Sequence, residues 1–157
     1  MGHIKKGRLK AMKNKEVYDN IINMLNENKF KFFLGGSRRF GYERPDSDFD
    51  IIIHKAAPVN LDIFTKIGVQ IVEIEATYYP DADVLLKGEN VHIIFVSSQH
   101  KFKSLRFMHD KIEKMLKDRP GIIEIVPILR ENGFTGGDIF HLLYHLTYTN
   151  KAGHLLP

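Results

Sequence analysis

The sequence predicts an α/β or α+β domain in which helices flank a mixed β-sheet. Strand-like segments rich in β-branched residues gather in the middle of the chain, and amphipathic segments with helical spacing lie before and after them. The chain has 157 residues, of which 43% are hydrophobic and 27% are charged. These values are ordinary for one globular domain, so wholesale disorder is not expected.

Four helices follow from apolar residues spaced three and four positions apart. They are expected at residues 14–27, 61–67, 98–117 and from 137 or 138 to about 148, and Asn14, Asn60 and Thr135 lie where caps are needed. The buried faces of the two longer helices are predicted to consist of Val17, Ile21, Ile22, Met24 and Leu25 in the first and Phe102, Leu105, Met108, Ile112 and Leu116 in the third.

The strands are shorter, and glycine, proline and charged turns bound them. A buried strand is expected at residues 30–34, and residues 35–47 are expected to be mostly turn and loop. Residues 48–54 form the second strand and residues 69–77 the third. Residues 83–86 and 91–96 are predicted to form a hairpin around the turn at 87–90. An apolar stretch interrupted by Pro127 then leads to the last helix.

The composition excludes several classes of protein. With no cysteine, the chain has no disulfide framework, no zinc-thiolate site and no thiol nucleophile. No apolar run approaches the roughly 20 residues of a membrane span, and the N-terminus lacks the apolar region of a signal peptide. A location in the cytoplasm, with no membrane partner, is therefore expected.

The net charge of +4 is spread unevenly. The first 15 residues contain no acid, so the rest of the chain is mildly acidic. Such a leader can contact the phosphates of a nucleic acid, or it can be a solvated, frayed terminus. The basic residues of this leader are Lys5, Lys6, Arg8, Lys10, Lys13 and Lys15.

Two carboxylates open the second predicted strand. Side chains alternate along a strand, so Asp48 and Asp50 share one face, with Phe49 on the other. Their backbone positions are about 7 Å apart by strand geometry. Such a pair can close on a hard divalent cation, and Mg²⁺ suits it because Mg²⁺ takes a few carboxylates and completes its shell with water and substrate phosphates.

A glycine-rich turn precedes this pair. Gly35 and Gly36 let the backbone approach a ligand closely, and Ser37 adds a hydroxyl at the same point. Arg38 and Arg39 stand beside them and could contact phosphate or be solvated. A phosphate-binding turn next to a carboxylate-bound metal is typical of sites that catalyse phosphoryl or nucleotidyl transfer.

Gly36-Ser37, ten intervening residues and Asp48-x-Asp50 between apolar residues resemble the signature of the DNA polymerase β-like nucleotidyltransferase superfamily. The run from Arg44 to Asp48 (RPDSD) is similar to that of its minimal members. The resemblance implies that the Gly-Ser pair binds the triphosphate of an NTP and that the Asp-x-Asp pair holds two Mg²⁺ ions. It also implies transfer of a nucleotidyl group, as from ATP, to an acceptor hydroxyl with release of pyrophosphate. A small molecule, a protein or an RNA end could supply that hydroxyl.

The resemblance also implies a domain organisation. Residues 1–13 are expected to be a flexible basic leader and residues 14–117 the nucleotidyltransferase-like domain. Residues 118–157 are expected to be a C-terminal helical extension packed on that domain.

Catalytic members of this superfamily carry a third carboxylate on a strand beside the Asp-x-Asp strand. The segment 91–95 is similar to that strand, but His92 stands where the acid is expected. Glu73 and Glu75, which share a face of the preceding strand, are the alternatives. If His92 holds the position, the chain is a weak or inactive transferase that still binds nucleotide or a macromolecular partner.

Overall fold

Five strands form one mixed sheet in the order β1-β2-β5-β4-β3. The computed structural model describes residues 2–55, 62–69, 71–75, 84–88 and 91–152. β2 and β5 pair in parallel, and the other three pairings are antiparallel. The strands are β1 (Lys31–Gly35), β2 (Phe49–His54), β3 (Ile71–Glu75), β4 (Val84–Gly88) and β5 (Val91–Val96).

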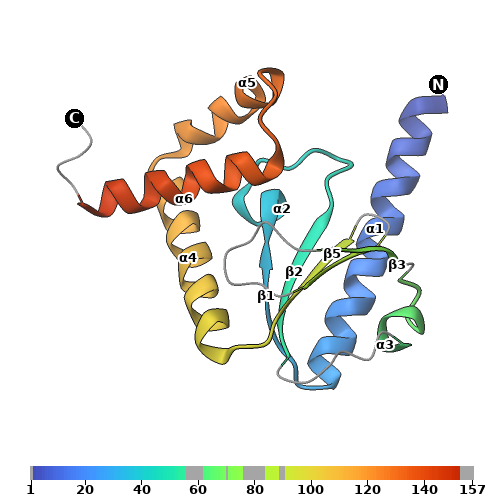
Figure 1. Cartoon of the computed structure of the whole chain (residues 1–157). Helices are drawn as coiled ribbons and strands as arrows, with labels where there is room; N and C mark the ends of the chain where they lie inside the picture. The colour runs from blue at the N-terminus through green and yellow to red at the C-terminus, as the bar shows by residue number, and fades with distance from the viewer. Residues whose placement is uncertain (1, 56–61, 70, 76–83, 89–90, 153–157) are drawn as a thin grey trace.

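The central parallel pair is buried on both faces, as its nearly continuous apolar sequence requires. Ile51, Ile53 and Ile93 belong to one buried cluster, and Ile52 and Ile94 belong to another. Two layers of helices produce these clusters. Figure 1 shows α1 and α3 on one face of the sheet and α4, α5 and α6 on the other.

Helices α1 (Gly2–Glu27) and α3 (Asp62–Thr65) cover the first face. Ile21, Met24 and Leu25 of α1 are buried against β2 and β5, and Phe64 of α3 joins the same cluster. The predicted apolar face of the first helix is therefore confirmed. The helix begins at Gly2, twelve residues before the predicted Asn14, and no proline interrupts residues 2–13.

The second face is covered by α4 (Gln99–Asp118) and by the C-terminal helices η1 (Pro120–Ile125), α5 (Val126–Glu131) and α6 (Gly136–Ala152). Ser98 caps α4 by accepting a hydrogen bond from the Lys101 backbone N–H. Phe140 and Leu143 of α6 are buried in the same cluster as Phe33 of β1, so the C-terminal helices share the core of the sheet.

The predicted class, a mixed sheet flanked by helices, is confirmed. Besides the earlier start of α1, the structure differs from the prediction at Lys87 and Gly88, which belong to β4 and not to a turn. It also differs in two longer segments. The glycine-rich stretch 35–47 contains the short helix α2 (Gly36–Phe40), and the apolar stretch around Pro127 is helical because proline is tolerated in the first turn of α5. Asn60 and the turn residues 89–90 lie outside the described residues. In the described part of the chain, no helix combines the length and apolar character that a membrane span requires.

Candidate active site

Asp48 and Asp50 lie at the N-terminal end of β2, on the face that α4 and α6 cover. Asp50 is buried, with 8% of its surface exposed, whereas the Asp48 side chain is 38% exposed. In the sheet register, Asp50 pairs with Gly35 of β1 on one side and with His92 of β5 on the other. Three adjacent strands therefore carry one row of paired residues, which consists of Gly35, Asp50 and His92.

The imidazole of His92 lies between the two carboxylates. Its Nε2 is 3.2 Å from Asp48 Oδ2, and its Nδ1 is 3.2 Å from Asp50 Oδ1. Both ring nitrogens can donate only when the ring is a protonated imidazolium. The two aspartates therefore lie on either side of the imidazole of His92, which occupies the space between them.

Gly36 brings the backbone against this carboxylate pair. Its φ of 72° lies in the left-handed region that glycine adopts without strain. An alanine Cβ built there would lie 2.9 Å from Asp50 Cγ, which is closer than real Cβ atoms approach other atoms. The chain then turns into α2, so Ser37 follows directly beside the acids.

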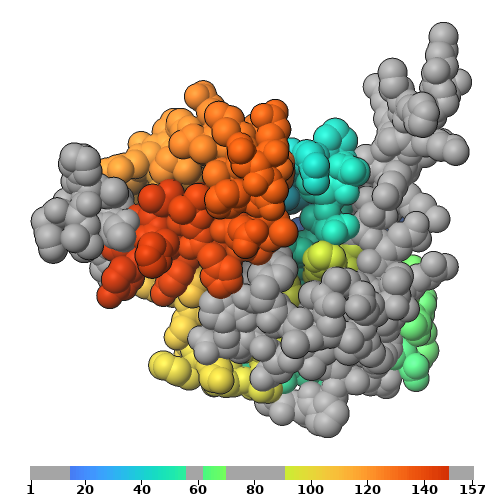
Figure 2. Space-filling view, turned by 45° about the horizontal axis from the view of Figure 1, so that its top comes forward, coloured from blue at the N-terminus to red at the C-terminus, as the bar shows by residue number. Residues whose placement is uncertain are grey.

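A cavity of about 410 Å³ opens over these residues. This volume lies in the range of small-molecule sites. Figure 2 shows the cyan surface around residues 40–50 facing the orange surface of the C-terminal helices, with a hollow between them. The lining residues are Gly36, Ser37, Tyr42, Arg44, Asp46, Ser47, Asp48, Asp50, His92, Arg130, Phe134, Thr135, Gly136 and Phe140.

Comparison with known proteins agrees with this geometry. The family model for the nucleotidyltransferase domain matches residues 19–127, well over half of the chain. The chain belongs to this nucleotidyltransferase family. No curated protein and no solved structure matches. The matched region contains β1 to β5 and hence the glycine turn, both aspartates and His92 of the nucleotidyltransferase domain.

The strand order decides which residue stands where a third acid is expected. β5 is the parallel neighbour of β2, so His92 occupies the position beside Asp50. Glu73 and Glu75 are on β3, at the far edge of the sheet, with β4 and β5 between β3 and β2. At about 4.8 Å per strand, this places their backbones well outside the reach of a metal held by Asp50.

The oxygen atoms of the carboxylate pair are ligands of the kind that a hard cation prefers. Two carboxylates line the same cavity on either side of His92, and Mg²⁺ characteristically takes one or two carboxylates together with substrate phosphates. Within the described residues, no group of three or more His, Cys, Asp or Glu side chains is arranged to hold a metal ion. Asp48 and Asp50 are therefore the residues that would hold Mg²⁺, with water and phosphate completing the shell.

The two arginines after Ser37 have structural contacts. Arg38 donates hydrogen bonds to the carbonyl oxygens of Ser47 (3.0 Å) and Pro45 (3.2 Å), and its guanidinium lies 4.0 Å from the centre of the Phe49 ring. It is not among the residues that line the 410 Å³ cavity, and neither is Gly35. The contacts of Arg38 hold the loop before Asp48 against α2.

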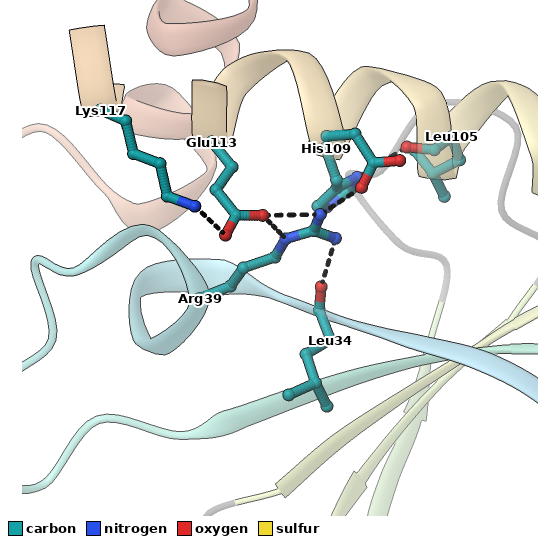
Figure 3. Close-up of polar contacts among 7 residues, drawn as sticks. Leu34, Arg39, Leu105, His109, Glu113 and Lys117 are labelled. Atoms are coloured by element: carbon teal, nitrogen blue, oxygen red, sulfur yellow. Dashed lines mark hydrogen bonds and ion pairs between the residues drawn. The ribbon is translucent and has the colours of Figure 1, made fainter. Parts of the chain in front are cut away.

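Arg39 joins α2 to α4 (Figure 3). Its guanidinium donates to the Leu34 carbonyl oxygen at 2.9 Å, to Glu113 at 3.0 and 3.2 Å, and to Asp110. The Arg39 side chain is only 12% exposed. The helix α2, which begins at the glycine turn, is thus fixed to the longest helix on its face of the sheet.

Behind the glycine turn lies a fully buried histidine of α4. The Nδ1 of His109 is 2.8 Å from the Leu105 carbonyl oxygen, and its ring packs against Phe33, Phe40 and Phe140. Burial lowers the pKa of His109 to about 4, with a smaller lowering from Arg39, so the ring is neutral near pH 7. The sequence interpretation did not include His109, although its spacing from Leu105 marks the same helix face.

Sequence reasoning also missed the far wall of the cavity, which includes Tyr42, Arg130, Phe134 and Phe140. Arg130 donates to the Tyr42 carbonyl oxygen at 3.1 Å and lies 5.7 Å from the centre of the Tyr42 ring. Burial raises the pKa of Tyr42 well above its ordinary value, and the charge of Asp50 raises it further. No sequence signal connects these residues with an aspartate pair up to ninety positions away.

Proposed function

We propose that this nucleotidyltransferase domain binds an NTP with Mg²⁺ and transfers its nucleotidyl group to an acceptor hydroxyl. The observation that carries the proposal is that Asp48 and Asp50 line one cavity together with Gly36 and Ser37, with His92 between the two carboxylates. Carboxylates beside a close-approaching backbone and a hydroxyl provide for both the cation and the phosphates of one ligand. A cytoplasmic location stays a prediction.

In the proposed reaction, the acceptor oxygen forms a bond to the α-phosphorus while the bond from that phosphorus to the β-bridging oxygen breaks. The nucleotidyl group is transferred, pyrophosphate leaves with the bonding electrons, and the hydroxyl proton passes to a base. Bound Mg²⁺, held as two ions by Asp48 and Asp50, would neutralise charge on the phosphate oxygens.

Gly36 and Ser37 are proposed to hold the β- and γ-phosphates. The arginines that line the cavity, Arg44 and Arg130, are better placed than Arg38 to balance phosphate charge, because the guanidinium of Arg38 contacts Ser47, Pro45 and Phe49 instead. Gly35 contributes indirectly, since a Cβ there would lie 2.7 Å from Ile52 Cδ1 and 3.1 Å from His109 Nε2, so the packing behind the turn would have to shift.

The proposal is tested by incubating the protein with NTP and Mg²⁺ and measuring pyrophosphate release in the presence of small hydroxyl compounds, RNA and protein acceptors. Calorimetry of NTP binding with and without Mg²⁺ accompanies the assay. Binding that needs Mg²⁺ and is lost in Asp50→Asn supports the proposal. NTP binding equal in wild type and variant, or absent from the wild type, overturns it.

A second candidate function rests on His92. Its imidazole stands beside Asp50 in the sheet register, where catalytic relatives are expected to carry an acid, and imidazole is a poor Mg²⁺ ligand. The alternative is therefore a catalytically impaired domain that binds nucleotide or a macromolecular partner. Nucleotide binding without pyrophosphate release for any acceptor would favour this alternative.

The basic leader defines a further proposed partner. α1 begins at Gly2, so residues 2–15 continue the helix whose later turns pack on the sheet. Figure 1 shows this end of α1 projecting beyond the sheet. If these residues contact nucleic acid, the protein should bind RNA in a salt-sensitive way. This binding should be lost when Lys5, Lys6, Lys10 and Lys13 are changed to Glu. Binding that survives this change would exclude the contact.

A further inference from the structure

The cavity has two walls that come from different parts of the chain. Gly36, Ser37, Asp48 and Asp50 lie within residues 19–127, the region that matches the nucleotidyltransferase family. The opposite wall comes from residues 130–140, which follow the matched region. The chemistry of the two walls differs, because the second one presents aromatic side chains where the first presents carboxylates and a hydroxyl.

Phe134 is the most exposed aromatic residue of this second wall. It is 41% exposed, although it is one of the larger apolar side chains of the domain. Phe140, the other phenylalanine of the wall, is 2% exposed and belongs to the core. Phe134 therefore gives the lining of this cavity an exposed aromatic ring, whose flat face a ligand ring can cover.

The backbone around Phe134 is held in place. Gly133 has a φ of 87°, and the Phe134 N–H donates to the Leu129 carbonyl oxygen at 3.0 Å. Directly afterwards, Thr135 and Asp138 form a reciprocal cap of α6: the Thr135 N–H donates to Asp138 Oδ2 at 2.8 Å, and the Asp138 N–H donates to Thr135 Oγ1 at 3.2 Å. The turn between α5 and α6 therefore presents Phe134 from a fixed backbone.

From these positions we propose that Phe134, in the turn between α5 and α6, is the surface on which the base of the bound nucleotide stacks. The inference rests on the proposed function, in which the phosphates lie against Ser37 and the aspartates. A nucleotide held there by its phosphates extends its base toward another wall of the cavity, and Phe134 is the exposed ring on that wall. Stacking on an aromatic side chain suits every base, since each has a π-face.

The test compares two probes, ATP and inorganic tripolyphosphate, each with Mg²⁺, by calorimetry on the full chain. Phe134→Ala should weaken ATP binding about tenfold, in line with the loss of one base stack, and leave tripolyphosphate binding unchanged. Phe107→Ala is the matched control, because Phe107 is also exposed (56%) but lies on α4 in a separate groove. This control should bind both probes as the wild type does.

Phe134→Trp adds a spectroscopic readout, since the chain contains no tryptophan. Stacking predicts that ATP changes the fluorescence of this variant and that tripolyphosphate does not. Equal ATP affinity in wild type and Phe134→Ala, with no fluorescence response in Phe134→Trp, would overturn the inference and leave the proposed function intact. Failure of both probes to bind the wild type would instead reject the proposed function.

Discussion

Gly36 and Asp50 are packed so closely that no side chain fits between them. A Cβ at Gly36 would lie 2.9 Å from Asp50 Cγ and 3.2 Å from Asp50 Cβ. Gly36 also has a φ of 72°. The absence of a side chain at Gly36 is therefore a condition for the position of the buried carboxylate.

Gly36→Ala should abolish NTP binding and lower stability, because the new methyl group must displace Asp50 and the backbone is strained. Gly68→Ala is the matched control: Gly68 has a φ of 94°, but a Cβ at this position would have no described atom within 4 Å. The control should lose only about 1 kcal/mol, from the left-handed backbone. Thermal unfolding and calorimetry measure both effects, and an equal stability loss in the two variants would contradict the proposed crowding.

Asp48→Asn and Asp50→Asn should each weaken Mg²⁺-dependent NTP binding by at least about tenfold, because each removes an anionic ligand from a hard cation. Both variants should still fold. The exposed Asp19 of α1 provides a control, Asp19→Asn, that changes net charge equally. Calorimetry that shows unchanged affinity in both site variants would reject the metal assignment.

His92→Asp should raise Mg²⁺ affinity, because it places a third carboxylate at the position that pairs with Asp50. Without Mg²⁺ the variant should unfold at a lower temperature than the wild type, since three acids then repel one another, and Mg²⁺ should reverse the loss. Glu73→Gln and Glu75→Gln should change neither property, because β3 is two strands removed from β5. A loss of transfer activity in either glutamine variant would contradict the strand-order argument.

The free energy of unfolding should decrease as the pH is lowered, because His109 titrates at a lower pH in the fold than in the unfolded chain. Its pKa is about 4 in the fold and about 6.5 when unfolded, so the unfolded chain binds the extra proton between these values. The resulting loss of unfolding free energy is absent above pH 6.5 and grows to ~3 kcal/mol as pH falls toward 4. His109→Phe should flatten this part of the curve in denaturant titrations at several pH values. An unchanged slope in the variant would assign the effect to other groups.

Arg39→Lys should destabilise the fold by about 1–3 kcal/mol, because lysine cannot reproduce the forked contacts with Leu34, Glu113 and Asp110. NTP affinity should also fall, since α2 carries Ser37. Lys117→Ala is the control: Lys117 also pairs with Glu113, at 3.5 Å, but its side chain is 75% exposed. Such exposed pairs contribute little, and similar losses in both variants would show that Arg39 has no special role.

The sequence could predict those features that depend on local pattern. The strands and long helices follow from the spacing of apolar residues, and the predicted core positions Ile21, Leu105 and Ile112 are fully buried. Spacing also identified Gly36, Ser37, Asp48 and Asp50, because they lie in one short stretch of chain. The structure brings these four together in one cavity.

What the sequence could not predict depends on contacts between distant segments. Whether His92 or one of two glutamates stands beside Asp50 is decided by the strand order, which no local pattern encodes. Arg38 and Arg39 look alike in sequence as phosphate ligands, yet their partners lie in the following loop and in α4. Phe134 reaches the cavity only because α5 and α6 fold back over the sheet.

The parallel pairing of β2 with β5 also sets the order in which the site can form during synthesis. β1 and β2 are antiparallel neighbours, so Gly36 and Asp50 can meet once the first fifty or so residues have emerged. His92 is synthesised about forty residues later, and its strand β5 pairs with β2 over a long separation in sequence. Such long-range parallel pairing is slow to form. The wall that carries Phe134 comes after both, so a nascent chain would bring Gly36 and Asp50 together before the cavity over them has its second wall.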